Sequence, residues 1–269
     1  MKLAFIGGGN MAQALITGLK NQNFAMQSIT VIELEANKRA ELEHTFGVNT
    51  STELAKIAAC DVIILAIKPQ QLPQLAKALA PLIKNQLIIS IAAGIRLADL
   101  SRWLGGYRII IRAMPNTPAQ IQAGVTGLYA MPSVSNTQIA QADQLLSAAG
   151  STLWLDSEEK LDAVTAISGS GPAYVFYLIE ALQEAALQLG LNEVQAKQLS
   201  LATFKGASLL ADRSATPIAT LREQVTSKGG TTEQGLLSLQ ASQVKEAIVL
   251  AAQNACERAK TLGDELGKD

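Results

Sequence analysis

Hydrophobic and polar residues alternate in blocks along the first half of the chain. Short apolar runs of strand type are each followed by a longer stretch with the period of an amphipathic helix. Asp61–Ile67 is apolar throughout after its first residue, as in a strand covered on both faces. The predicted strands are Leu3–Ile6, Ser28–Glu33, Asp61–Ile67, Leu87–Ile91, Tyr107–Arg112, Gly124–Ala130 and Ser151–Leu155, and the predicted helices are Met11–Leu19, Ala36–Thr45, Leu72–Leu82, Leu97–Leu104 and Thr137–Ala149. This alternation predicts an α/β fold with a doubly wound parallel sheet.

From about Asp156 onward the strand pattern disappears and helical periodicity remains. The predicted helices are Ala173–Leu189, Glu193–Leu210, Ile218–Gln224, Thr232–Gln240 and Val244–Leu262. The pattern therefore divides the chain into an α/β domain at residues 1–156 and an all-α domain at residues 157–269.

The predicted helix Ala173–Leu189 is apolar around most of its circumference, with Glu180 and Glu184 as its clearly charged residues. Such a helix is usually buried on several sides. In a small all-helical domain, the simplest cover is the same helix of a second copy. We therefore expect a homodimer that forms through this half of the chain.

The turn after the first predicted strand carries a glycine motif. Gly7, Gly9 and Ala12 form G-x-G-x-x-A between an apolar strand and a helix. The first glycine permits a tight turn, the second lets the backbone approach a pyrophosphate, and the alanine lets the helix pack closely on the strand. The helix start, with Asn10 and Met11, presents free N–H groups to the phosphate. The motif predicts a Rossmann-type dinucleotide-binding domain.

Composition narrows the function classes. Of 269 residues, 48% are hydrophobic and 17% charged, and the net charge is −1, so no basic field favours nucleic acid or an anionic membrane. No apolar run reaches the ~20 residues of a membrane span, and the first residues lack a signal-peptide pattern. Cys60 and Cys256 have neither metal-site spacing nor a disulfide framework. We expect a cytoplasmic protein without a bound metal and without nucleic-acid or membrane partners.

Three predicted strands end in segments of small or turn-forming residues, at the edge where open α/β sheets bind ligands. The segments are Ala66–Pro69, Ser90–Gly94 and Arg112–Ala119. The small residues of the second segment would let a flat ring lie against the backbone. The candidate cofactor-binding residues here are Ala66, Lys68, Pro69, Ala92, Ala93, Gly94, Pro115 and Asn116. Lys68 has two open interpretations: contact with substrate or cofactor, or extension from a strand end into solvent.

Two loops in the helical half also carry reactive residue types. Thr226–Glu233 combines hydroxyl groups with two glycines just before a predicted helix. Ser168–Gly171 looks like a nucleophile loop, but that motif needs a preceding strand and a histidine partner. The only histidine, His44, lies in the charged helix after the second strand, and we expect it on the surface. This argues against a serine hydrolase and against a dehydrogenase with a histidine relay.

Six segments, taken in order, resemble the pyrroline-5-carboxylate reductase family. They are F-I-G-G-G-N-M from Phe5, A-I-K-P from Ala66, S-I-A-A-G from Ser90, R-A-M-P-N-T-P-A from Arg112, S-G-S-G-P-A-Y-V-F from Ser168 and S-K-G-G-T-T from Ser227. Any one of them occurs in other dehydrogenases, but the ordered set is specific. The resemblance implies a Rossmann domain, a helical dimerisation domain whose dimers can assemble further, and NAD(P)H-dependent reduction of L-1-pyrroline-5-carboxylate to L-proline.

The resemblance also places the substrate carboxylate at the glycine-containing hydroxyl loop. A turn at a helix start offers backbone N–H groups and hydroxyls to a carboxylate. Thr232, the donor nearest the ring nitrogen in the family, is the candidate catalytic residue that polarises or protonates it. The candidate substrate-binding residues are Ser227, Gly229, Gly230, Thr231 and Thr232. The alternative is that Thr231 or Thr232 only caps the helix. The family commonly has proline at the position of Lys228, which leaves the loop shape open.

The implied cofactor is NADPH or NADH, and Glu33 bears on the choice. This residue ends the second predicted strand and is placed to accept hydrogen bonds from the adenosine ribose hydroxyls. NADPH carries a phosphate there, which many members of the family meet with a small polar residue followed by arginine, whereas this chain has Glu33 and Leu34. We expect NADH to bind at least as well as NADPH. The alternatives are that Glu33 turns to solvent, or that Lys38 and Arg39 reach the phosphate.

Three other functions remain open at this point. A β-hydroxyacid dehydrogenase has a similar layout but places a catalytic lysine on the interdomain helix, and residues 170–184 of this chain contain no lysine. An imine reductase with a different substrate would share the cofactor domain. A non-catalytic dinucleotide-sensing module would not need the loop at 227–232 to act with the strand ends.

Overall fold

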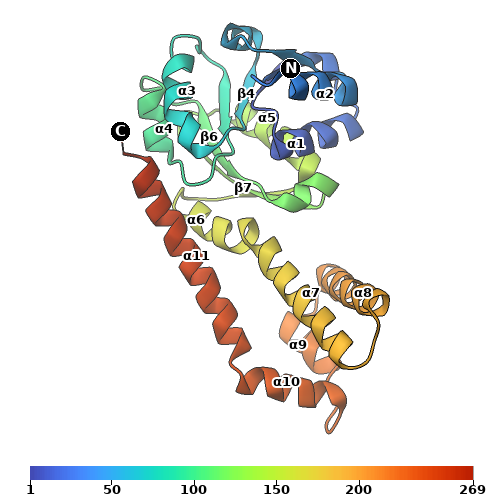
Figure 1. Cartoon of the computed structure of the whole chain (residues 1–269). Helices are drawn as coiled ribbons and strands as arrows, with labels where there is room; N and C mark the ends of the chain where they lie inside the picture. The colour runs from blue at the N-terminus through green and yellow to red at the C-terminus, as the bar shows by residue number, and fades with distance from the viewer. Residues whose placement is uncertain (269) are drawn as a thin grey trace. The chain divides into compact units, whose positions relative to one another are not determined.

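The structure, a computed structural model, describes residues 1–268. The chain forms two compact units, which can be followed in Figure 1 by residue colour. The first comprises Met1–Ser170 together with the described residues from Ala255 on, and the second comprises Gly171–Asn254. The chain therefore passes between the units twice, once after Ser170 and once after Asn254.

The first unit is built on an eight-stranded sheet with the strand order β3-β2-β1-β4-β5-β6-β7-β8. The strands are β1 (Leu3–Ile6), β2 (Ile29–Ile32), β3 (Asn49–Ser51), β4 (Val62–Leu65), β5 (Leu87–Ser90), β6 (Ile110–Met114), β7 (Gly124–Ala130) and β8 (Gly150–Trp154). All neighbouring strands pair in parallel except β6 and β7. The predicted doubly wound α/β fold is confirmed, with one antiparallel pair within it.

Three details of the sheet differ from the sequence prediction. The parallel order fails at β7 because the connection from β6 holds only a 3₁₀ turn, Thr117–Ile121, whereas a parallel crossover needs about a dozen residues or more. The apolar pattern misses β3, whose three residues are polar; this strand forms through backbone pairing with β2 at the sheet edge. β6 begins at Ile110 rather than at Tyr107.

Helices cover both faces of the sheet (Figure 1). α1 (Asn10–Asn21), α2 (Ala36–Phe46) and α5 (Asn136–Leu146) pack on one face, and α3 (Leu72–Leu79) and α4 (Leu97–Trp103) pack on the other. Successive strand residues point to opposite faces, so Ile63 and Ile64 enter different apolar cores. This explains the uninterrupted apolar run in the sequence of β4.

A connector leads from the sheet to the second unit. It contains α6 (Lys160–Val164) and a π-helical turn (Thr165–Gly169), neither of which the sequence pattern predicts. The second unit is all-helical, with α7 (Gly171–Gln188), α8 (Glu193–Asp212), α9 (Ile218–Gln224) and α10 (Thr231–Ala241). α11 (Val244–Leu266) begins in this unit and ends in the first. Within residues 1–268, no helix is long and apolar enough to cross a membrane.

Candidate active site

The strand register brings the candidate cofactor residues to one edge of the sheet. Ile32, Ile6, Leu65, Ser90 and Arg112 are paired in one row across β2, β1, β4, β5 and β6. Because these strands are parallel, the segments that follow the row all leave the sheet at its carboxyl edge. The strand order reverses between β1 and β4, and open α/β sheets bind ligands at such a switch point.

The glycine turn between β1 and α1 has the geometry that its motif predicts. Gly7 has φ +96°, and a Cβ there would lie 2.6 Å from the carbonyl oxygen of Ala66. Gly9 is the N-cap of α1, and a Cβ at Gly9 would meet no atom within 4 Å. Within the described residues, the backbone N–H groups of residues 10–12 have no hydrogen-bond partner. The open space and these donors fit a dinucleotide pyrophosphate.

Replacing Gly7 by alanine is expected to raise the Kd for NADH by at least about tenfold, since a Cβ must displace the Ala66 carbonyl or reshape the turn. NADH fluorescence titration measures this Kd. The matched control is Gly47→Ala: Gly47 also has positive φ but lies at the end of α2 with open space around it, so its variant should lose stability and not affinity. Wild-type affinity in a folded Gly7→Ala variant would contradict the role of the turn.

Glu33 follows β2, and its carboxylate is fixed beside the glycine turn. One oxygen accepts a hydrogen bond from Gly8 N–H at 3.0 Å, and the other accepts one from Glu35 N–H at 3.0 Å. Partial burial acts to raise the pKa of Glu33, but the hydrogen bonds from Glu35 and Gly8 outweigh it and hold the pKa below its ordinary value. The carboxylate is therefore charged at neutral pH and has lone pairs left for further donors.

The residues that follow β4 form the next part of the edge. Ala66 is half-buried against the glycine turn, and Pro69 begins a 3₁₀ turn that leads into α3. Lys68 is exposed, and among residues 1–268 no hydrogen bond or ion pair engages its ammonium group. Both interpretations of Lys68 therefore stay open.

The loop after β5 is held between the sheet and the end of α11. Ala92 is buried, while Ala93 is exposed at the surface of the loop. Gly94 has φ +74°, and a Cβ there would lie 3.4 Å from the Cδ1 atom of Leu266. A small exposed residue, Ala93, thus lies on a loop that is packed at Ala92 and Gly94, and its contact with a cofactor ring stays a prediction.

Pro115 and Asn116 follow β6, and both are buried. The Asn116 side chain makes two hydrogen bonds within the unit: its Oδ1 accepts from Val125 N–H at 2.9 Å, and its Nδ2 donates to the Ser168 carbonyl oxygen at 3.1 Å. The side chain thus joins the end of β6 to β7 and to the π-helical turn. Contact between Asn116 and the cofactor stays a prediction. The groups left for such a contact are the second hydrogen of the side-chain amide and the backbone.

Sequence reasoning misses a charged cluster beneath this edge. Arg112, only 5% exposed, pairs with Glu158 at 3.0 Å and with Asp162 at 3.5 Å, both from the connector. The available signal was an arginine at the end of an apolar strand, because a buried arginine needs a charged partner. Nothing in the sequence indicates which carboxylates supply it, since they lie 46 and 50 residues away.

The candidate substrate residues lie in the second unit, between α9 and α10. Gly230 is the N-cap of α10, and Thr231 and Thr232 are the first two helical residues. Neither threonine therefore occupies the N-cap position that the alternative interpretation assigned to it. Their backbone N–H groups and hydroxyls donate no hydrogen bond to the described part of the chain. These groups remain available for a substrate carboxylate.

Two other backbone donors of the loop are already used. Gly229 has φ +73°, and its N–H donates to the Glu233 carboxylate at 2.7 Å. The N–H of Gly230 donates to the Ser227 carbonyl oxygen at 3.0 Å. These hydrogen bonds shape the loop, so the two glycines contribute its conformation and the two threonines contribute the free donors.

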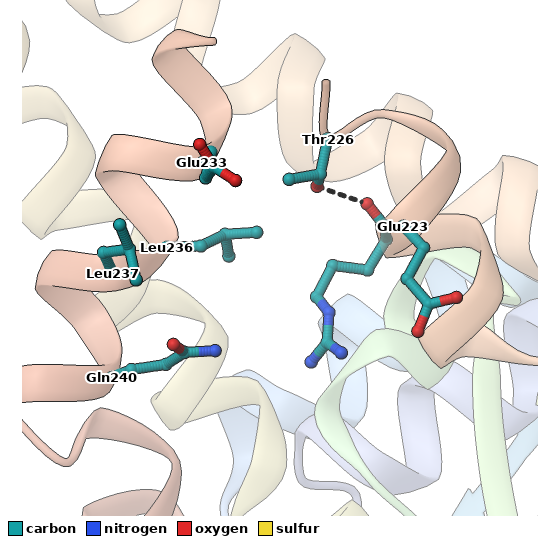
Figure 2. Close-up of a pocket in the computed structure, with 7 residues that line it drawn as sticks. Glu223, Thr226, Glu233, Leu236, Leu237 and Gln240 are labelled. Carbon is teal, nitrogen blue, oxygen red and sulfur yellow. Dashed lines mark hydrogen bonds between the residues drawn. The ribbon is translucent and has the colours of Figure 1, made fainter. Parts of the chain in front are cut away.

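A cavity of about 180 Å³ lies behind this loop, between α9 and α10. Figure 2 shows Glu233, Leu236 and Gln240 projecting from α10 toward it, opposite Thr226. It is lined by Arg222, Glu223, Thr226, Glu233, Leu236, Leu237 and Gln240. The Thr226 hydroxyl donates to the Arg222 carbonyl oxygen at 2.6 Å and so ends α9. The cavity separates the two helices that the loop joins.

Two residues that the sequence analysis singled out, His44 and Ser168, lie outside these clusters. His44 is exposed on α2, as predicted. The Ser168 hydroxyl donates to the carbonyl oxygen of Val164 at 3.0 Å, within the connector. Ser168 therefore lacks the histidine that would activate it as a nucleophile.

Two family models match the chain. The model described as pyrroline-5-carboxylate reductase dimerisation matches residues 158–262. The model described as NADP oxidoreductase coenzyme F420-dependent matches residues 2–94. The first covers the connector and the helical unit, and the second covers the glycine turn and the strand ends as far as Gly94.

Relatives match over the whole length. A pyrroline-5-carboxylate reductase of Pseudomonas aeruginosa is 45% identical, covering 99% of this chain and 98% of the relative. The solved structure of a pyrroline-5-carboxylate reductase from Coxiella burnetii has 38% identity and a TM-score of 0.92, covering 97% of this chain and 98% of that one. Plasmodium falciparum pyrroline carboxylate reductase, solved with NADP bound, has 30% identity and a TM-score of 0.87, covering 98% of both chains. The chain therefore belongs to the pyrroline-5-carboxylate reductase family.

Proposed function

We propose that this reductase uses NADH at least as readily as NADPH and holds its imine substrate at the Ser227–Thr232 loop. The reaction follows from the family: reduction of L-1-pyrroline-5-carboxylate to L-proline with a nicotinamide dinucleotide. Membership of this family replaces the β-hydroxyacid dehydrogenase and sensing-module alternatives. The observation that carries the cofactor choice is the Glu33 carboxylate, fixed beside the glycine turn.

A charged Glu33 favours the dinucleotide without a phosphate on its adenosine ribose. The carboxylate can accept hydrogen bonds from the two ribose hydroxyls of NADH, whereas in NADPH it faces a phosphate of like charge. If the repulsion between the carboxylate and the phosphate is equivalent to one pKa unit, it costs about 1.4 kcal/mol, which lowers the affinity for NADPH roughly tenfold.

The two neighbouring cations have other partners in the structure, and the charge of Lys38 is the last of the causes that lower the pKa of Glu33. Lys38 pairs with Glu35 at 2.6 Å, and Arg39 donates to the main-chain oxygens of Glu33 and Leu34 at 3.0 and 2.8 Å. Leu34 is 79% exposed and offers a phosphate no donor beyond its backbone. The Plasmodium relative was solved with NADP bound, so the proposal rests on these residues of this chain and not on the family as a whole.

The test compares kcat/KM for NADH and NADPH at the same salt concentration and pH. The wild type is expected to show at least equal kcat/KM with NADH. The double variant Glu33→Ser, Leu34→Arg should shift the ratio toward NADPH by roughly tenfold or more. Glu53→Ser is the control, because it removes an exposed carboxylate that pairs with neither Lys38 nor Arg39 and should shift the ratio far less. A strong wild-type preference for NADPH would refute the role of Glu33.

The proposed roles of the individual residues are cofactor binding, substrate binding and hydrogen bonding to the imine. The bound dinucleotide supplies the hydride, which reaches the imine carbon. The start of α1 holds the pyrophosphate through its free N–H groups, and the loop at 92–94 supports the nicotinamide end. Thr231 and Thr232 bind the substrate carboxylate, and the Thr232 hydroxyl donates toward the ring nitrogen, which becomes the amine of proline. Positioning and hydrogen bonding are thus the contributions of the protein.

The dimerisation match supports an oligomer, and we place its interface on the helical unit. Apolar side chains of α7 are widely exposed in the single chain, with Phe176 at 65% and Tyr177 at 72% exposure. A second copy would cover them, and dimers could then assemble further. Cys60 and Cys256 are free thiols, which suits the expected cytoplasmic location.

A further inference from the structure

The buried cluster around Arg112 joins segments that are distant in sequence. The Arg112 side chain is 6% exposed, those of Glu158 and Asp162 are 20% and 11% exposed, and the guanidinium lies between the two carboxylates. A buried guanidinium of this kind requires charged partners, since its desolvation is costly. The cluster lies at the end of β6, directly before the segment that contains Pro115 and Asn116.

Glu158 does more than neutralise Arg112. The oxygen that binds Arg112 at 3.0 Å also accepts a hydrogen bond from Leu97 N–H at 2.8 Å. Leu97 is the first residue of α4, whose leading N–H groups have no partners within the helix. A single carboxylate oxygen therefore connects the start of α4 to the end of β6.

This connection spans the loop after β5. Residues 91–96 run from the end of β5 to the start of α4, so the position of Leu97 fixes one end of the loop that holds Ala93. Arg96, at the same end of the loop, contacts α11: it pairs with Asp264 at 2.7 Å, where the side chains are 40% and 61% exposed, and it donates to the Lys260 carbonyl oxygen at 3.2 Å. Glu158 therefore adds a partly buried polar restraint at the α4 end of the loop, beside the packing of the loop against α11.

Asp162 provides a natural comparison. It binds the same guanidinium and is the more buried of the two carboxylates, yet within the described residues it forms no hydrogen bond or ion pair with α4. Loss of charge at Asp162 would disturb the cluster without releasing the loop. Among the described members of the cluster, Glu158 is the one that hydrogen-bonds to the residue at the end of the loop.

We infer that Glu158 is a positioning residue for hydride transfer, acting through Leu97 on the loop at 92–94 and through Arg112 on the segment with Pro115 and Asn116. The inference rests on the proposed dinucleotide site at the carboxyl edge of the sheet. Hydride transfer depends steeply on the approach of donor and acceptor, and a displacement of about 1 Å can cost roughly 10²-fold in rate. Releasing the loop should therefore affect both cofactor affinity and the chemical step.

The experiment compares Glu158→Ala, Glu158→Gln and Asp162→Asn with the wild type. Fluorescence titration gives the Kd for NADH, steady-state kinetics give kcat and both KM values, and NADH deuterated at the transferred position gives the isotope effect on kcat. Glu158→Ala is expected to raise the Kd for NADH several-fold, to lower kcat by roughly tenfold and to increase the isotope effect. The KM for pyrroline-5-carboxylate should stay within about twofold.

The two other variants decide whether the effect is specific. Glu158→Gln keeps an acceptor for Leu97 N–H and should recover most of the kcat, whereas Asp162→Asn should leave the isotope effect at its wild-type value. A merely structural role would reduce the fraction of active enzyme and leave Kd and isotope effect unchanged, which would overturn the inference. An isotope effect that rises as much in Asp162→Asn as in Glu158→Ala would also overturn it. If Glu158→Ala fails to fold, the shorter Glu158→Asp, which withdraws the carboxylate from Leu97 N–H, takes its place with the same expected increase, and a wild-type isotope effect there would overturn the inference. The wild type is titrated in the same experiment. If the wild type binds NADH normally and the Glu158 variants behave like it, this inference fails and the proposed function stands.

Discussion

Replacing Thr232 by alanine is expected to lower kcat for pyrroline-5-carboxylate by a factor within ~10²–10⁴, the range for a positioned acid or donor. Thr232 lies in the first turn of α10, and its hydroxyl donates no hydrogen bond to residues 1–268, so it is available to the substrate. The imine nitrogen gains basicity as the hydride reaches the carbon, and a donor placed there stabilises the transition state more than the ground state. Steady-state kinetics with saturating NADH measure the loss.

Two controls separate chemistry from folding. Thr232→Ser keeps the hydroxyl and should retain kcat within about tenfold of the wild type. The Kd for NADH should hardly change in either variant, because the dinucleotide residues belong to the first unit. A folded Thr232→Ala variant with unchanged turnover would remove Thr232 from the mechanism.

Placing an aspartate at Phe176 is expected to yield monomers or aggregates with little activity. Phe176 and Tyr177 are the most exposed aromatic side chains of α7, and a charge at this position cannot be buried in an apolar interface without a large desolvation cost. The control is Asn136→Asp, which adds the same charge at an exposed polar position at the start of α5 in the first unit. Sedimentation velocity gives the oligomeric state, and assays at the same protein concentration give the activity. An active wild-type monomer would contradict the dimer proposal directly.

The fold could be predicted from the sequence wherever burial determines the pattern. Asp61–Ile67 predicted β4 because a strand covered on both faces must be apolar at every position. This reasoning missed β3 because its residues are polar. The strand forms through backbone pairing with Thr30, Val31 and Ile32, which leaves no apolar pattern in the sequence. The direction of β7 escaped it as well, because direction depends on the length and shape of the connection from β6.

The candidate site was predictable in its local parts. The glycine turn, the acidic residue after β2 and the hydroxyl loop are each encoded within a few consecutive residues, so their motifs could be recognised. The hydrogen bonds that connect these parts are long-range and carry no local signal. Glu158 accepts a hydrogen bond from Leu97 N–H, 61 residues away in the sequence. Glu33 accepts one from Gly8 N–H, 25 residues away. Sequence reasoning therefore named the candidate ligand-binding groups and missed the hydrogen bonds that hold their segments in place.

The most direct test of the central claim is the yield of proline from NADH. Purified wild-type chain is mixed with NADH and pyrroline-5-carboxylate, and the loss of NADH absorbance is followed while proline is quantified from the same sample. The account predicts that proline forms in an amount equal to the NADH consumed, at a rate at least equal to that with NADPH. Tight NADH binding without proline formation, or proline formation with NADPH alone, would contradict it.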